Sequence, residues 1–223
     1  MFITVPALLG PAQLEEVDRL FNEAPFVDGK LSAGMAAQRV KRNEELDQAS
    51  PVYERLNGIV LYNLLRHRVF RNAVLPHKFA APFYARYGPG MAYGDHIDDP
   101  VMGSPHHYRS DVSVTVFLSP PESYEGGELV VRTEFGERQV KLPAGHAVIY
   151  PSSSVHHVNA VTAGERRVMV MWIQSMVRDP ARRELLYQLN QVRERALRKA
   201  PDAEDTKRLD IVYANLLRMW AEV

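Results

Sequence analysis

Apolar residues follow a helical period near both ends of the chain and a strand-like alternation in between. Between Pro11 and Phe21 they recur every three or four residues after a proline suited to a helix start. A second helical pattern runs from Val52 to Leu65, and helical spacing returns after Pro180. The last helical stripe consists of Leu209, Val212, Tyr213, Leu216, Leu217 and Trp220. These patterns predict helices before and after a differently built middle region.

From about Lys78 to Gln174 the sequence changes to short β-rich runs separated by turn residues. Val112–Leu118 and Arg167–Ile173 are examples, and Gly126-Gly127 and the Pro-Ala-Gly at 143–145 separate such runs. Several short strands at this spacing predict a sandwich or barrel such as a jelly roll. The predicted fold class is therefore α+β, a double-stranded β-helix core with N-terminal helices packed on it and a C-terminal helical extension.

The amino-acid composition limits the possible binding partners and metal ligands of the protein and says less about its fold. The 223 residues suit one domain with a sizeable core and a small helical appendage, and 27 basic residues balance 27 acidic ones. Nothing global therefore favours binding to nucleic acid or to an anionic membrane. The chain has no cysteine, which excludes disulfides and thiolate sites and leaves His, Asp and Glu as metal ligands.

The N-terminal ten residues are apolar but lack a basic segment and a small-residue cleavage site. The run is also too short to span a bilayer. We therefore expect a first strand of a cytoplasmic protein at this end.

His96 and Asp98, two residues apart, are the first candidates for metal chemistry. On a strand they would point to the same face, and His156 lies in a later β-rich run. Two imidazoles and one carboxylate match the 2-His-1-carboxylate triad of non-haem Fe(II) oxygenases. His157 is adjacent to His156, and because neighbouring strand residues point opposite ways, only one of the two can face the metal.

Arg166 follows the turn at 162–164 and is a candidate anchor for a dicarboxylate cosubstrate. A guanidinium can bind a distal carboxylate through two hydrogen bonds while the other end of the cosubstrate chelates the metal. Arg167 is the rival, since both faces of the following run are apolar. From strand parity alone the choice between the two arginines stays open.

Several blocks of the sequence resemble one known family. They are Val40-Lys41-Arg42-Asn43, the stretch from Arg86 to Asp98, Arg109 to Ser113, Tyr124 to Leu129, Leu142 to Gly145, Tyr150 to His156, Trp172 to Ser175 and Asn215 to Glu222. In this order they are similar to the PKHD-type hydroxylases, bacterial Fe(II)/2-oxoglutarate dioxygenases related to prolyl 4-hydroxylases. The resemblance covers nearly the whole chain.

The resemblance implies a role for particular residues. It makes His96, Asp98 and His156 the Fe(II) ligands, favours Arg166 over Arg167 as the 2-oxoglutarate anchor, and lets the Tyr87 hydroxyl help hold the same carboxylate. It implies dependence on L-ascorbate and a dioxygenase domain over residues 1–178, with its catalytic core at about 78–178 and the helical extension at 179–223.

The expected reaction uses O2 to hydroxylate an unidentified substrate and releases succinate and CO2. The resemblance suggests a peptide prolyl residue or a small metabolite as substrate, and a link to iron uptake and iron homeostasis. Two alternatives stay open: a catalytically silent sensor of iron or 2-oxoglutarate that acts through a partner, and a metal hydrolase using the same triad. The apolar stripe of the last helix could pack on the core or form a homodimer.

Overall fold

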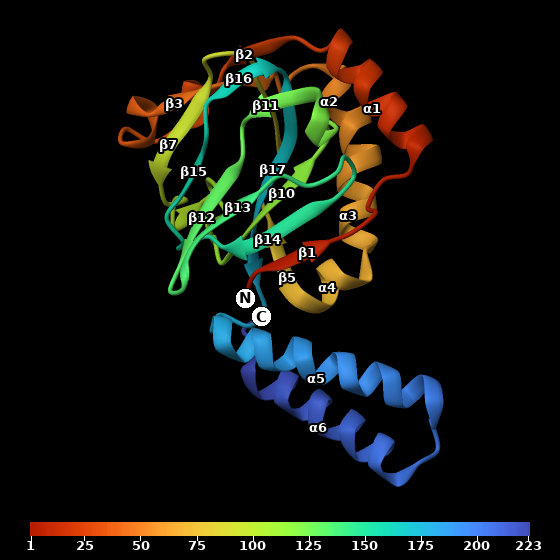
Figure 1. Cartoon of the computed structure of the whole chain (residues 1–223). Helices are drawn as coiled ribbons and strands as arrows, with labels where there is room; N and C mark the ends of the chain where they lie inside the picture. The colour runs from red at the N-terminus through yellow and green to blue at the C-terminus, as the bar shows by residue number, and fades with distance from the viewer.

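The computed structural model describes all 223 residues and contains two large antiparallel sheets, two short strand pairs, a group of N-terminal helices and a C-terminal helical hairpin (Figure 1). The N-terminal helices lie along one face of the larger sheet, and the hairpin extends away from the sheets. The predicted combination of terminal helices with an antiparallel β core is confirmed.

The larger sheet has eight strands and carries most of the core. Its path, in spatial order, is β1 (Ile3–Val5), β14 (Ala147–Pro151), β10 (Val112–Phe117), β17 (Arg166–Ser175), β6 (Phe83–Tyr87), β4 (Glu44–Leu46) and β2 (Phe26–Asp28), with β5 (Pro76–Phe79) paired to β17. The strand predicted at the N-terminus is therefore β1, which pairs with β14.

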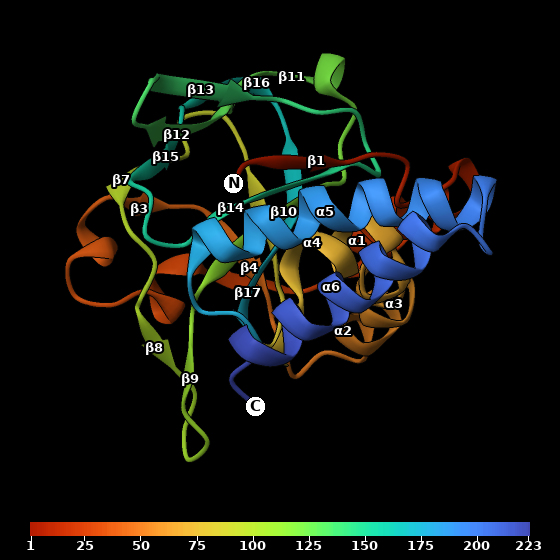
Figure 2. The same ribbon diagram turned by 90° about the horizontal axis from the view of Figure 1, so that it is seen from below.

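The smaller sheet has five strands in the order β13 (Gly136–Val140), β12 (Leu129–Thr133), β15 (His156–Val158), β7 (Ala92–His96) and β3 (Lys41–Arg42). Two further pairs complete the β structure, β11 (Tyr124–Gly126) with β16 (Val161–Gly164) and β8 (Val101–Met102) with β9 (Tyr108–Arg109). The β8–β9 hairpin projects from the body of the molecule (Figure 2).

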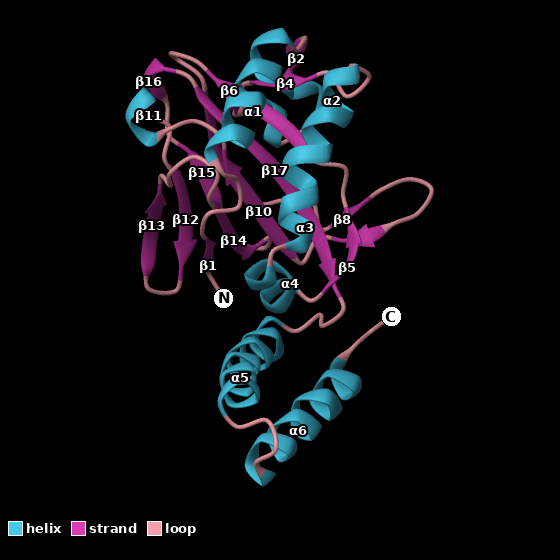
Figure 3. Cartoon of the chain, turned by 90° about the vertical axis from the view of Figure 1, so that its right-hand side faces the viewer, coloured by secondary structure: helices cyan, strands magenta, loops and turns pink.

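Helices α1 (Pro11–Glu23), α2 (Pro51–Leu56), α3 (Tyr62–Arg66) and α4 (Arg68–Val74) cover the outer face of the larger sheet (Figure 3). The helix predicted at 52–65 is interrupted by a π-helical turn at Asn57–Leu61, and α4 was not predicted. A cluster of buried side chains joins these helices to the sheet.

Alternation along β10 separates that helix-covered core from the space between the sheets. Val112, Val114 and Val116 belong to the cluster under the helices, so Ser113 and Thr115 face the opposite side. The strand is buried on both faces, and its two polar positions therefore lie in the interior.

The C-terminal hairpin consists of α5 (Pro180–Lys199) and α6 (Glu204–Trp220). Asp179 caps α5 by accepting hydrogen bonds from the backbone of residues 181 and 182. The hairpin packs on the end of α4 through a small apolar cluster built around Leu75, Val177 and Leu186, to which Leu216 and Trp220 contribute. None of the helices is both long and apolar enough to cross a bilayer.

Candidate functional site

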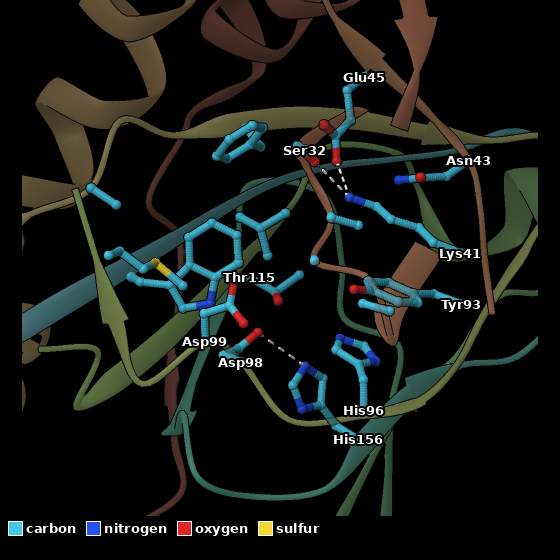
Figure 4. Close-up of a pocket in the computed structure, with 18 of the residues that line it drawn as sticks. Ser32, Lys41, Asn43, Glu45, Tyr93, His96, Asp98, Asp99, Thr115 and His156 are labelled. Atoms are coloured by element: carbon cyan, nitrogen blue, oxygen red, sulfur yellow. Dashed lines mark hydrogen bonds and ion pairs between the residues drawn. The ribbon is translucent and has the colours of Figure 1, made fainter. Parts of the chain in front are cut away.

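A cavity of about 410 Å³ lies between the two sheets and takes its walls from both of them (Figure 4). His96 and His156 line it from β7 and β15 of the smaller sheet. Arg166 and Trp172 line it from β17 of the larger sheet. The predicted candidates therefore lie around one cavity, although they come from distant parts of the chain.

His96, Asp98 and His156 converge at this cavity. One nitrogen or oxygen from each lies within 4.8 Å of the others. The two histidines are direct partners across β7 and β15, with ring centroids 4.2 Å apart. His156 Nε2 is 3.8 Å from Asp98 Oδ1. Three donors of these types at this spacing could hold one metal ion.

Hydrogen bonds to backbone carbonyls fix both imidazole rings. His96 Nδ1 donates to Gly94 O at 2.8 Å, and His156 Nδ1 donates to Ser154 O at 2.9 Å. In a neutral ring whose proton is held on Nδ1, the Nε2 atom keeps a lone pair for a metal. Burial, and after it the neighbouring His156, lowers the pKa of His96 to about 3, so its ring is neutral at physiological pH.

Asp98 reaches the cavity from outside the strand, because β7 ends at His96. The expected strand alternation therefore does not explain why the two residues converge. Instead the Ser113 hydroxyl donates to Asp98 Oδ2, and the Ser113 and Ser152 hydroxyl oxygens are 2.7 Å apart. Burial raises the pKa of Asp98. The polar inner face of β10 thus orients the only carboxylate of the triad.

The neighbouring histidines are held elsewhere. His157 points away from the cavity, where its Nδ1 contacts Asp95 Oδ1 at 2.9 Å and its Nε2 contacts Asn159 Oδ1 at 3.2 Å. His106 and His107 are exposed in the loop of the β8–β9 hairpin. Of the two adjacent histidines in β15, only His156 faces the cavity.

Arg166 is the most deeply buried charged residue at the cavity, with 1% of its surface exposed. Its Nε and Nη1 have no hydrogen-bond partner within the protein. The guanidinium lies 4.9 Å from the centre of the Tyr87 ring, and Tyr87 is the partner of Arg166 across β6 and β17. Burial raises the pKa of Tyr87 to about 12, which keeps its phenol protonated. A buried cation without an ion-pair partner is suited to an anionic ligand.

Arg167 points to the helix-covered side of the same strand. It bonds to Glu165 Oε1 at 2.5 Å and to Asp18 Oδ1 at 2.8 Å, so its charge is already compensated. Residues 169, 171 and 173 of the strand point the same way and join the core under the helices. The structure therefore distinguishes the two arginines, which the apolar pattern of the strand did not.

Sequence patterns did not indicate the polar group at the other side of the cavity. Lys41 and Glu45 form an ion pair there, next to Asn43 and Tyr93 (Figure 4). The Tyr93 ring stacks on His96 with centroids 3.6 Å apart. In the sequence Lys41, Asn43 and Glu45 lie in a polar stretch without a periodic pattern, so only the fold places their side chains around the same cavity as the triad.

Comparisons with known proteins agree with this geometry. Residues 82–174 match the model of the 2OG-Fe(II) oxygenase superfamily, and residues 180–222 match that of the PKHD-type hydroxylase C-terminal domain. A PKHD-type hydroxylase of Thioalkalivibrio sulfidiphilus is 60% identical over 100% of both chains. One from Klebsiella pneumoniae is 44% identical over 98% of this chain and 99% of its own.

Solved structures share the fold at much lower identity. A Pseudomonas putida prolyl-4-hydroxylase has a TM-score of 0.53 and 19% identity, covering 78% of this chain and 92% of its own. HygX from Streptomyces hygroscopicus, solved with nickel, 2-oxoglutarate and hygromycin B, has a TM-score of 0.54 and 16% identity, covering 79% of this chain and 84% of its own. At these identities the likeness concerns the fold alone.

Proposed function

Because the chain belongs to the PKHD-type hydroxylase family of 2OG-Fe(II) oxygenases, we propose that His96, Asp98 and His156 bind its Fe(II) and that Arg166 and Tyr87 bind 2-oxoglutarate. The enzyme is a dioxygenase that hydroxylates a substrate still to be identified and releases succinate and CO2. The observation that carries the site assignment is the buried, unpartnered Arg166 in the same cavity as the three converging ligands.

The donor set fits Fe(II). Two neutral imidazoles and one carboxylate are the ligands of the facial triad, which leaves positions open for a chelating cosubstrate and O2. The backbone hydrogen bonds at both Nδ1 atoms direct the Nε2 atoms toward the same point as Asp98. These three side chains supply all the protein ligands of a facial triad.

The cavity also fits a small dicarboxylate. The charges of Fe(II) and Arg166 together balance those of Asp98 and the 2-oxoglutarate dianion, so the filled site is neutral. Arg166 has free donors for the distal carboxylate, and the protonated Tyr87 hydroxyl is a further donor beside it. The apolar side chains of Leu129, Val158 and Val168 line the same cavity and keep water from competing for these bonds.

Each residue has a definite part in the proposed mechanism. Bound Fe(II) with 2-oxoglutarate supplies the activation of O2 for oxidation of a C–H bond. Arg166 fixes the distal end of the cosubstrate, and Ser113 holds the Asp98 carboxylate in one orientation. Because these groups are positioned before substrate binds, little reorganisation is needed during the reaction.

We extend the proposal to several properties of the whole protein. They are a double-stranded β-helix as the topology of the core, a division into a dioxygenase domain at 1–178 and an extension at 179–223, and L-ascorbate as the reductant that restores oxidised iron. They also include a cytoplasmic location, no nucleic-acid or membrane partner, and a homodimer formed through the helical segments. Exposed apolar residues on α5 and α6, among them Leu185, Ile211 and Met219, support the homodimer. Light scattering on the purified protein measures its oligomeric state.

The test compares three single variants under air with Fe(II), ascorbate and 2-oxoglutarate, with succinate as the readout. Asp98→Ala is expected to lose both iron retention and turnover. Arg166→Leu is expected to retain iron but to raise the 2-oxoglutarate requirement by tenfold or more, since it removes a charge-assisted anchor. Arg167→Leu is the matched control and should leave that requirement unchanged.

Two results would contradict the assignment. Unchanged succinate formation by Asp98→Ala would exclude the triad, and a raised 2-oxoglutarate requirement in Arg167→Leu alone would exclude Arg166 as the anchor. Binding of 2-oxoglutarate by the wild type without any succinate release would favour a sensor.

A further inference from the structure

Lys41 and Glu45 form a buried ion pair in the wall of the cavity. Lys41 Nζ donates to Glu45 Oε1 at 2.5 Å, and both residues are 6% exposed. Both line the cavity that contains the triad. Taking two charges out of water is costly, and such a pair adds little net stability compared with apolar side chains of similar size. A stabilising role alone is therefore a weak explanation for its presence.

The pair occupies the junction between the two sheets. Lys41 is paired with Tyr93 in the smaller sheet, whereas Glu45 is paired with Ala85 in the larger one. The short segment between them crosses from one sheet to the other, so the ion pair spans the gap at this edge. Both charged ends are thereby held in place on a β framework instead of on a mobile loop.

Each partner keeps an unused hydrogen-bonding position. An ammonium group has three donors, and Lys41 directs one to Glu45 and one to Ser32 Oγ at 2.9 Å. The second carboxylate oxygen of Glu45 has no hydrogen-bond partner. The pair therefore offers one N–H donor and one oxygen acceptor side by side in the cavity wall.

The pair lies close to the proposed metal ligands. Lys41 Nζ is 5.3 Å from the centre of the Tyr93 ring, and the opposite face of that ring stacks on His96 (Figure 4). A group bound by the pair is thus separated from a metal ligand by one aromatic ring. Large apolar side chains, among them Phe83, Tyr108 and Trp172, line the same cavity.

We propose that Lys41 and Glu45 bind a secondary amide group of the primary substrate, with Lys41 donating to the amide oxygen and Glu45 accepting from the amide N–H. The inference rests on the proposed function, because it concerns the substrate of that site. The apolar side chains that line the cavity then contact the carbon groups on either side of the amide. The amide fixes the distance from the reacting C–H bond to the metal.

The chemistry of the pair selects this group over charged ones. A carboxylate that approached Lys41 would also meet the free oxygen of Glu45, and an ammonium that approached Glu45 would meet Lys41. An amide is neutral and carries an acceptor next to a donor, so it satisfies both positions without adding charge. The amide can come from a peptide backbone or from a small aryl amide.

The test measures binding by calorimetry to the full-length protein loaded with Mn(II) and 2-oxoglutarate. One set of probes is N-acetyl dipeptide methylamides, and the other is N-methylbenzamide, which separates the two sources of the amide. Each probe has an ester counterpart in which the amide N–H is replaced by oxygen. The wild type is expected to bind at least one amide about tenfold or more tightly than its ester, since the ester leaves Glu45 without its donor.

Two variants test the individual partners. Glu45→Gln keeps an oxygen for Lys41 but can turn an N–H₂ donor toward the cavity, so the amide-over-ester preference should disappear or reverse. Lys41→Met keeps the length of the side chain but removes the donor, so amide and ester affinities should fall together. Glu44→Gln is the matched control, because Glu44 precedes Glu45 in β4 and forms a half-exposed pair with Arg86.

The melting temperature and the 2-oxoglutarate affinity of each variant show whether the fold and the cosubstrate site survive. The proposal is overturned if no amide binds the wild type more tightly than its ester, or if Glu45→Gln keeps the same preference as Glu44→Gln. Failure of the wild type to bind 2-oxoglutarate would instead contradict the proposed function, and the amide–ester comparison is then made with Mn(II) alone. If Lys41→Met does not fold, Glu45→Gln decides the question.

Discussion

At Arg166 and Arg167, the direction of the side chain decides which residue can bind a ligand in the cavity. They are adjacent, carry the same charge and belong to the same strand. Arg166 is nevertheless buried with Nε and Nη1 free of hydrogen bonds, whereas Arg167 forms ion pairs with Glu165 and with Asp18 of α1. The difference follows from the two faces of β17, one toward the second sheet and the other toward the helices. Because the Arg167 guanidinium is already paired with carboxylates of the protein, it is poorly suited to bind the carboxylate of a cosubstrate.

Ser113→Ala tests whether Asp98 depends on its hydrogen bond for orientation. Removal of the hydroxyl leaves the carboxylate buried without that donor, so Mn(II) affinity should fall about 10- to 100-fold while the fold persists. Titration calorimetry measures the affinity. Ser123→Ala is the control, because the Ser123 hydroxyl bonds only to the backbone oxygen of Pro120. Equal Mn(II) affinity in both variants would show that Ser113 does not position Asp98.

At the scale of elements, the turn between β11 and β12 determines how closely the chain packs against Arg166. Gly126 and Gly127 both have positive φ, at 69° and 66°, in the turn that leads from β11 to β12. A Cβ at Gly127 would lie 3.1 Å from Cδ of Arg166 and 3.0 Å from Val161. The turn therefore needs glycine for its backbone conformation and also for close packing against the proposed cosubstrate anchor.

Gly127→Ala is expected to raise the 2-oxoglutarate KM several-fold and to destabilise the protein by about 1–2 kcal/mol, because the new methyl group pushes on Arg166 and strains the turn. Steady-state kinetics and thermal unfolding measure the two effects. Gly136→Ala is the control, since Gly136 also has a positive φ, of 105°, but no atom within 4 Å of its Cβ position. It should lose stability without a change in KM. If Gly127→Ala and Gly136→Ala both raised the 2-oxoglutarate KM, the effect could not be assigned to the contact between residue 127 and Arg166.

Glu194 joins the C-terminal hairpin to α4. It accepts from Asn72 at 3.0 Å and from Arg68 at 2.6 Å. Burial alone would raise the pKa of Glu194, but hydrogen bonds from Asn72 and Asn190, together with the charge of Arg68, lower it. A lowered pKa in the folded state means that the ionised group stabilises the fold above the pKa of an unfolded Glu, about 4.3, and that this contribution is lost as the pH falls below it.

Glu194→Gln should therefore lower the melting temperature at neutral pH, and its difference from the wild type should shrink as the pH falls below about 4. Calorimetric scans over a pH series measure the difference. The control is Glu204→Gln, whose carboxylate is exposed and pairs only with Arg208 one turn away. A constant difference across the pH series would mean that Glu194 acts through packing and not through its charge.

For the whole molecule, the proposed ligands should act as a clamp between the two sheets, because His96 and His156 come from one sheet and Arg166 from the other. At a hundredfold excess over Kd, a ligand that binds only the folded state stabilises it by about 2.7 kcal/mol. For a chain of this length that corresponds to roughly 5–10 °C in melting temperature.

Mn(II) with 2-oxoglutarate should produce that shift in the wild type, and differential scanning fluorimetry measures it. Asp98→Ala should show no shift, because the metal and therefore the chelating end of 2-oxoglutarate lose their site. An equal shift in both proteins would mean that the ligands bind outside the triad.

The sequence by itself determined the nature of the elements and the chemistry available to them. Helical periods at both ends and alternation between them follow from local burial, and the absence of cysteine left only His, Asp and Glu as metal ligands. His96, Asp98 and His156 could be singled out because residue type and spacing are local properties, and the family blocks around them run through the whole chain.

Only the tertiary structure decided which faces meet. Parity could not separate Arg166 from Arg167, because both sides of β17 are buried, one under helices and one in the cavity. Asp98 converges through a serine of β10 and not through strand alternation, since β7 ends two residues earlier. The Lys41–Glu45 pair joins two sheets from within a polar stretch that has no period. Contacts between segments far apart in the sequence depend on how the two sheets pack, and the local pattern of apolar and polar residues contains no information about that packing.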